Sequence, residues 1–163
     1  MGDMTLSFGT LEGLGAETGL DSPRGLTAGT TVLTLDGALP VQFLSPGDRV
    51  VTRNGARELV AVEVAVLRGQ EMVRISAASL GHDRPEADLF VAPGQKILVR
   101  DWRAKALYGK PAAMVAAERL ADGSYIRKET VAEVRLFTLR FARDEVIYAA
   151  GLELCCEAAP VHA

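Results

Sequence analysis

Cysteine is nearly absent from this sequence of 163 residues, and its only two cysteines, Cys155 and Cys156, are neighbours. Adjacent cysteines cannot join distant parts of a chain, so a disulfide-stapled fold is excluded. We interpret the pair as small hydrophobic residues near the end of a strand. A metal site built from both thiols and His162 has one ligand too few and no standard spacing, so we expect neither a metal nor a cofactor.

Long apolar runs and an excess of positive charge are also missing. No apolar stretch approaches the roughly 20 residues that a membrane-spanning helix needs, and no basic region followed by an apolar stretch marks a secretory signal. Lysine and arginine number 18 against 21 aspartates and glutamates, which gives a net charge of −3. This small negative charge does not favour a nucleic acid or an anionic membrane as partner. We therefore expect neither of them as a partner, and with no signal visible the cytoplasm is only the default compartment.

The composition that remains is that of one globular domain. Hydrophobic residues make up 48% of the chain and charged residues 24%, which is enough to bury a core. Residues 1–24 differ from the rest because they hold five glycines, four acidic residues and one arginine. We predict a flexible leader over residues 1–24, a domain over 25–157 and a tail over 158–163. An edge strand over residues 4–8 is the alternative for the leader.

From Gly25 onward, short β runs are separated by residues that favour turns. Asp36-Gly37 and Asn54-Gly55 are two-residue hairpin signals. Residues 57–67 alternate valine with other mostly apolar residues, which predicts a strand covered on both sides. The predicted strands are residues 31–35, 39–44, 49–52, 57–67, 72–76, 88–92, 96–100, 125–128, 133–141 and 145–150.

Helical patterns are weak throughout the chain. Residues 110–120 are rich in alanine and fit a short helix or a strand, and no stretch has a helical pattern that is both long and periodic. The many short strands predict an all-β fold that is compact and strongly bent, with short helical turns at most. Asp48 is expected to accept hydrogen bonds from backbone N–H groups in its turn, and Trp102 is expected to pack on the core.

An ordered series of sequence blocks resembles the Hint family, the module shared by inteins and by the autoprocessing part of hedgehog proteins. The matching blocks are, in order, residues 25–32, 39–41, 44–50, 88–98, 102–104, 107–109, 120–123, 126–127 and 145–149. The resemblance covers roughly residues 25–157 and fits the bacterial Hint-type branch best. It implies a compact β horseshoe.

In active members of this family the domain begins with a cysteine or serine, whose side chain attacks the carbonyl group just before it and forms a thioester or ester. A histidine in a Thr-x-x-His motif of the second block helps to protonate the departing amide nitrogen. The resemblance places Gly25 at the nucleophile, Ala92 at the threonine and Gln95 at the histidine. Asp144 stands where the bacterial branch often has another histidine.

These four replacements predict a Hint fold without its chemistry. Glycine offers no nucleophile, and the amide of Gln95 does not titrate near neutral pH. We therefore predict a domain without self-cleavage or splicing, acting as a structural or interaction module for an unidentified protein partner. Replacing Gly25 by cysteine together with Gln95 by histidine is expected to restore a thiol-cleavable junction after residue 24.

Two other functions stay open from the sequence. An autoprocessing domain could use an unorthodox nucleophile such as Thr27 or Cys155, or a displaced acid–base group such as His82. The simpler interpretation of Thr27 is strand chemistry, and that of His82 is an exposed histidine in a loop. The second alternative is an unrelated β-barrel module that binds a small molecule or a peptide.

Overall fold

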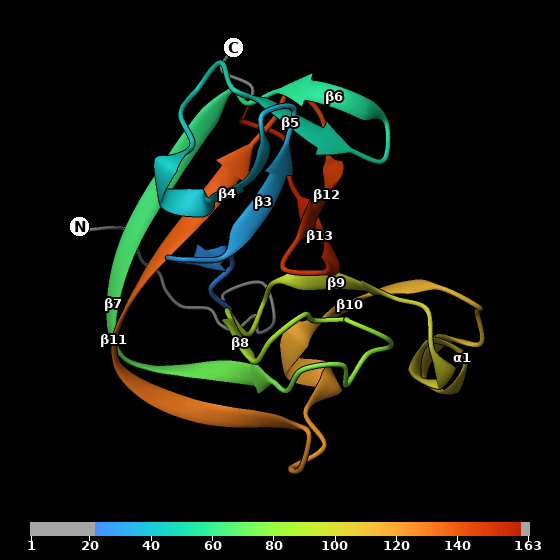
Figure 1. Ribbon diagram of the computed structural model, residues 1–163. Coiled ribbons are helices and arrows are strands. Elements are labelled where there is room, and N and C mark those ends of the chain that lie inside the picture. The colour runs from blue at the N-terminus through green and yellow to red at the C-terminus, as the bar shows by residue number, and fades with distance from the viewer. Residues whose placement is uncertain (1–21, 161–163) are drawn as a thin grey trace.

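The computed structural model describes residues 22–160, and Figure 1 shows two long, curved strands that run along one side of it. The strands are β2 (Leu26–Thr27), β3 (Thr31–Thr34), β4 (Gly37–Pro40), β5 (Arg49–Thr52), β6 (Gly55–Glu58), β7 (Ala61–Ile75), β8 (Leu89–Val91), β9 (Lys96–Val99), β10 (Ala113–Ala116), β11 (Ile126–Arg140), β12 (Glu145–Ala149) and β13 (Leu152–Cys156). The described part also contains the helix α1 (Trp102–Tyr108) and two short 3-10 helices, Val41–Phe43 and Ala117–Leu120. Most of the predicted leader and the end of the predicted tail, residues 1–21 and 161–163, lie outside the described residues.

The strands form two sheets, as expected of an all-β fold. One sheet has eight strands in the order β10-β9-β13-β12-β3-β5-β6, with β4 paired to β3. In the other, β11, β2, β8 and β7 close a ring. β7 and β11 are the two long strands of Figure 1, and they pair antiparallel from Ala61 opposite Arg140 to Ile75 opposite Ile126. One hydrophobic cluster joins both sheets, with Val32 and Ile147 from the first and Ile75 and Leu139 from the second.

Both predicted hairpins are present and are closed in the same way. In the β3–β4 hairpin, the Thr34 hydroxyl donates a hydrogen bond to the Gly37 carbonyl at 2.8 Å. In the β5–β6 hairpin, the Thr52 hydroxyl donates to the Gly55 carbonyl at 2.6 Å. The loops themselves are residues 35–36 and 53–54, and the glycine that follows each loop has a positive φ, as in hairpins whose turn ends in a left-handed residue.

Several predicted strand boundaries are wrong. Residues 57–67 do not form one strand, because β6 ends at Glu58 and β7 begins at Ala61. β7 then continues through residues 72–75, and β11 joins the separately predicted segments 125–128 and 133–141. The polar residues in the middle of each long strand lack an alternating pattern, but the ladder between β7 and β11 holds them extended.

Residues 39–44 and 110–120 each contain two elements. β4 ends at Pro40, whose φ of −58° starts a 3-10 turn, and Leu44 N–H donates to the Val41 carbonyl at 3.1 Å. Residues 110–120 contain both β10 and the 3-10 helix Ala117–Leu120. The seven-residue helix α1 was not predicted. It is fixed by its ends, since Asp101 caps the Arg103 N–H and Gly109 adopts a left-handed conformation.

The expectation that the valine-rich strand is covered on both sides is wrong. Val60, Val64 and Val66 are each about half exposed. Val60 directly precedes β7, and Val64 and Val66 lie in the part of β7 before Val73, which is paired only with β11 among the described strands. Trp102 does not pack on the core either. It is 70% exposed, and the Arg103 guanidinium lies 4.8 Å from its ring centre.

Two smaller observations complete the fold. Asp48 accepts a hydrogen bond from the Ser45 N–H at 2.9 Å, which confirms its predicted role in the turn. No helix in the stretch from residue 22 to residue 160 combines the length and the apolar character needed to cross a membrane.

Candidate functional site

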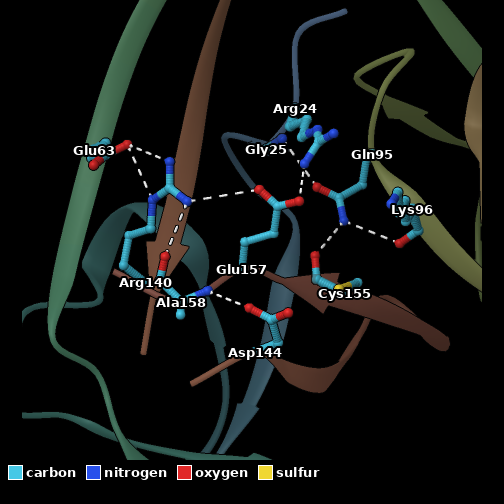
Figure 2. A network of polar contacts seen from close by, with 10 residues as sticks. All are labelled: Arg24, Gly25, Glu63, Gln95, Lys96, Arg140, Asp144, Cys155, Glu157 and Ala158. Carbon is cyan, nitrogen blue, oxygen red and sulfur yellow. Dashed lines mark hydrogen bonds and ion pairs between the residues drawn. The ribbon is translucent and has the colours of Figure 1, made fainter. Parts of the chain in front are cut away.

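Gly25 and Gln95 are in direct contact, although 70 residues separate them in the chain. Gly25 directly precedes β2, and its backbone N–H donates a hydrogen bond to Gln95 Oε1 at 3.0 Å. The Gln95 amide nitrogen donates to the Cys155 carbonyl at 2.8 Å and to the Lys96 carbonyl at 3.1 Å (Figure 2). With two carbonyl acceptors on one side and one N–H donor on the other, the orientation of this buried side-chain amide is fixed.

The loop before β9 positions Gln95. Its N–H donates to the Ala92 carbonyl at 3.0 Å, which closes a turn over Pro93 and Gly94. Gly94 packs directly on the chain that precedes Gly25, because its N–H donates to the Pro23 carbonyl at 2.8 Å and an added Cβ would lie 2.8 Å from the same oxygen. Ala92 is fully buried in a small cluster with Met72 and Leu136, and it has no polar side chain to offer the site.

The backbone of Gly25 adopts a conformation that side chains resist. Its φ is +116°, in the region that favours glycine. A Cβ atom at this position would lie 3.0 Å from the Phe137 carbonyl oxygen and 3.1 Å from Thr138 Oγ1. A cysteine or serine at position 25 would therefore require the local backbone to change.

The residues before Gly25 are tied down on both sides. The Arg24 guanidinium forms an ion pair with Glu157, just after β13. The Ser22 hydroxyl donates to a Glu118 carboxylate oxygen at 3.1 Å. Three contacts, through Ser22, Pro23 and Arg24, thus hold the chain on the domain immediately before the junction with Gly25.

A cavity of about 370 Å³ opens over this junction. Its polar lining includes the cations Arg24, Lys96 and Arg140 and the carboxylate Glu157. Glu157 lies between the guanidinium groups of Arg24 and Arg140, as Figure 2 shows. Arg140 also bonds Glu63 at 3.2 Å. The charged groups of the lining are therefore more often positive than negative, and apolar residues such as Leu26 and Phe137 complete it.

Cys155 and Cys156 occupy the end of β13, as predicted, and both line the cavity. Burial raises the pKa of the Cys155 thiol, and the nearby carboxylates of Asp144 and Glu157 raise it further. Burial also raises the pKa of Cys156 far above its usual range. Since the thiolate is the reactive form, this environment disfavours either sulfur as a nucleophile.

Asp144 lies apart from the Gly25–Gln95 contact. Its carboxylate accepts a hydrogen bond from the Ala158 N–H at 2.7 Å and so fastens the chain that follows β13. It forms no hydrogen bond or ion pair with Gly25 or Gln95 (Figure 2). The structure thus brings Gly25 and Gln95 into contact, with Ala92 in the turn that positions Gln95, and leaves Asp144 outside this contact.

The alternative site residues Thr27 and His82 do not line this cavity. Thr27 donates to the Phe90 carbonyl at 3.1 Å and faces a second cavity of about 420 Å³. His82 is almost fully exposed in the loop before β8, with Asp83 as its neighbour at 3.4 Å. Within residues 22–160, no three histidine, cysteine, aspartate or glutamate side chains are grouped as metal ligands would be.

A family model described as a Hint domain matches residues 24–158, which is most of the chain. The chain belongs to the Hint domain family. This confirms the resemblance inferred from the sequence blocks and replaces the alternative of an unrelated β barrel. No curated protein matches this Hint domain.

Solved structures of inteins share the fold at low sequence identity. The MchDnaB-1 intein has a TM-score of 0.52 and 13% sequence identity, and the match covers 81% of this chain and 99% of that intein. The gp41-1 intein has a TM-score of 0.53 and 13% sequence identity, and the match covers 82% of this chain and 98% of that intein. A bacterial intein-like domain from Clostridium thermocellum has a TM-score of 0.55 and 15% sequence identity, and the match covers 83% of this chain and 99% of that domain. These similarities show the fold of the Hint domain.

Sequence reasoning missed the charged residues that surround the junction. Arg140 and Glu157 come from the end of β11 and from the segment after β13, and nothing in their local sequence links them to Gly25. Only the tertiary structure places them, and the pairing of β7 with β11 brings Glu63 opposite Thr138, where it bonds Arg140.

Proposed function

We propose that this Hint domain keeps the peptide bond between Arg24 and Gly25 intact and serves as a structural or interaction module. The observation that carries the proposal is the contact between the Gly25 N–H and Gln95 Oε1. Gly25 has only a hydrogen atom where active family members carry the nucleophilic side chain. Gln95 presents an amide oxygen where they carry the acid–base histidine.

The acyl shift needs a nucleophile and a proton for the departing nitrogen, and this site is poor in both. Gln95 presents an acceptor to the Gly25 nitrogen, and its N–H groups are committed to the Cys155 and Lys96 carbonyls. An amide with this orientation has no proton to give to the leaving nitrogen. The ties through Ser22, Pro23 and Arg24 support the same proposal because they hold the uncut chain in place.

Cleavage through Cys155 is the second candidate function. Its motivation is that Cys155 lines the same cavity as Gly25. The raised pKa of its thiol and the lack of a titratable group at position 95 argue against it. It predicts that any cleavage disappears in a Cys155→Ala variant and persists in a Cys156→Ala variant.

Intact-mass spectrometry of fresh and aged protein, with and without dithiothreitol or hydroxylamine, tests the proposal. We expect one species of 17.4 kDa under every condition. A fragment that ends at Arg24 would contradict the proposal. Loss of that fragment in Cys155→Ala, but not in Cys156→Ala, would establish the second candidate instead.

Restoring the family residues is a second arm of the same experiment. The sequence alone favours a thiol-cleavable junction in the double variant Gly25→Cys, Gln95→His. The positive φ of Gly25 and the close Phe137 carbonyl now argue against it, because the new side chain does not fit the present backbone. We therefore expect the folded double variant to stay uncut, which the same mass measurement checks.

A further inference from the structure

Three arginines converge on one buried carboxylate that lines neither of the two cavities described above. Glu153 lies in β13, and its side chain is 7% exposed. Arg100 bonds it at 3.0 and 3.1 Å, Arg53 at 2.9 Å, and Arg84 lies 3.5 Å away. These arginines come from the end of β9, the β5–β6 hairpin loop and the loop before β8, so three separate elements meet here.

One arginine is enough to satisfy Glu153. Arg100 forms a two-pronged contact, with Nε on one carboxylate oxygen and Nη2 on the other. Burial alone would raise the pKa of Glu153, but the bonds from Arg100 and Arg53 outweigh it and the pKa is lowered. Arg53 and Arg84 therefore add two positive charges beyond the one that neutralises the carboxylate.

Two nearby acids are paired with other arginines and do not offset these charges, whereas Asp83 and Glu86, which flank Arg84 in its loop, are exposed to solvent that screens them. Glu145, the next buried acid, accepts from Asn54 at 2.9 Å and is paired with Arg57 at 3.5 Å. Asp101, which follows Arg100 in the chain, is paired with Arg103. Both acids are thus committed to partners of their own.

The surplus guanidinium groups are partly open to solvent. The side chains of Arg53 and Arg100 are 42% and 47% exposed. Arg84 is more enclosed and also donates to the Leu98 carbonyl at 3.1 Å, which holds it in place. Among the contacts of the described residues, Arg53 uses only Nη1, so its remaining N–H groups can donate to a bound anion.

We propose that Arg53, Arg84 and Arg100 form a binding site for a dianionic phosphate group. A phosphate monoester carries nearly two negative charges at neutral pH, which matches the two uncompensated positive charges. Guanidinium groups also match the oxygen geometry of phosphate. A single carboxylate would neutralise only one of the two charges.

Isothermal titration with inorganic phosphate at fixed ionic strength, with chloride as the reference salt, tests the proposal. We expect saturable binding to the full chain and a Kd raised about tenfold in Arg53→Gln, which removes one charge-assisted contact. Arg68→Gln is the matched control, since Arg68 is exposed on β7 and pairs with Glu133. Its Kd should equal that of the unmodified chain.

Two further measurements complete the design. Glu153→Gln removes the competing carboxylate, so the folded variant should bind phosphate more tightly. Phosphoserine is titrated beside inorganic phosphate, and the tighter ligand shows whether the group comes from a monoester or from the free ion. Absence of saturable phosphate binding, or equal weakening by Arg53→Gln and Arg68→Gln, would overturn the proposal. The result is independent of whether the Arg24–Gly25 bond is cleaved.

Discussion

Gln95 shows how one side chain can occupy a catalytic position and make a different set of bonds. Its oxygen accepts from the Gly25 N–H, and its nitrogen bonds two carbonyl groups. All of its polar groups are used, which a buried amide requires. At residue scale the site is therefore a set of satisfied hydrogen bonds that joins Gly25, the loop before β9 and the end of β13.

The close packing of Gly25 against the Phe137 carbonyl can be tested by the substitution Gly25→Ala, which adds one methyl group. Gly25→Ala places a Cβ atom 3.0 Å from the Phe137 carbonyl at a positive φ, so we expect a loss of about 1–3 kcal/mol of unfolding free energy. Gly29→Ala is the control, because Gly29 also has a positive φ but nothing lies within 4 Å of the added atom. Urea denaturation of both variants measures the difference. Equal losses would mean that the Phe137 contact has no effect.

The long strands β7 and β11 determine the architecture at the scale of elements. Each has 15 residues, and they pair along their whole length. One end of β7 is paired with β8 and packs on the core, whereas the other end is paired only with β11 among the described strands. A single strand thus passes from a buried to an exposed environment.

This change of environment predicts different effects of one substitution within β7. Val73 is fully buried and Val64 is 55% exposed. Threonine has nearly the same shape as valine and also favours strands, so Val73→Thr mainly buries an extra hydroxyl and should cost about 1–3 kcal/mol. Val64→Thr should change the unfolding free energy by less than about 0.5 kcal/mol. Thermal denaturation compares them, and a similar loss in both would contradict the exposed position of Val64.

Across the whole molecule, buried carboxylates link the two halves of the larger sheet. Glu153 in β13 and Glu145 in β12 bind arginines of the β5–β6 hairpin, and Glu153 also binds Arg100 at the end of β9. These contacts reach across a sheet whose strands are far apart in sequence. They make the stability of the fold depend on ionised glutamates.

The lowered pKa of Glu153 predicts how stability varies with pH. Its contribution is fully present above the ordinary glutamate pKa of about 4.3 and is lost as the pH falls through the lower pKa of the folded state. Glu153→Gln should therefore destabilise the protein at pH 7 by about 1–3 kcal/mol, since it removes charge-assisted hydrogen bonds while the arginines stay partly solvated.

Urea denaturation between pH 7 and pH 3 measures this effect. The gap between the unmodified chain and Glu153→Gln should narrow as the pH falls, because the glutamate itself becomes neutral. The exposed Glu133→Gln serves as control and should cost less than about 1 kcal/mol. A gap that stays constant with pH would show that the carboxylate charge of Glu153 is not what stabilises the fold.

Local sequence signals determined the parts of this protein that depend on neighbouring residues. The hairpins at Gly37 and Gly55, the turn at Asp48 and the strand-end position of Cys155 follow from backbone preferences and short-range bonds. The ordered blocks also identified the Hint family, because turn glycines and buried strand residues are needed for the fold whether or not chemistry takes place.

Only the tertiary structure decided what depends on partners distant in sequence. The polar middles of β7 and β11 are strands because each supplies the other's hydrogen bonds, and the exposure of Val64 follows from which part of β7 packs on the core. In the same way, Gln95 meets Gly25, and three arginines meet Glu153, through elements that the fold brings together. Pairing register and side-chain contacts of this kind are set by the packing of the whole chain, which no local pattern encodes.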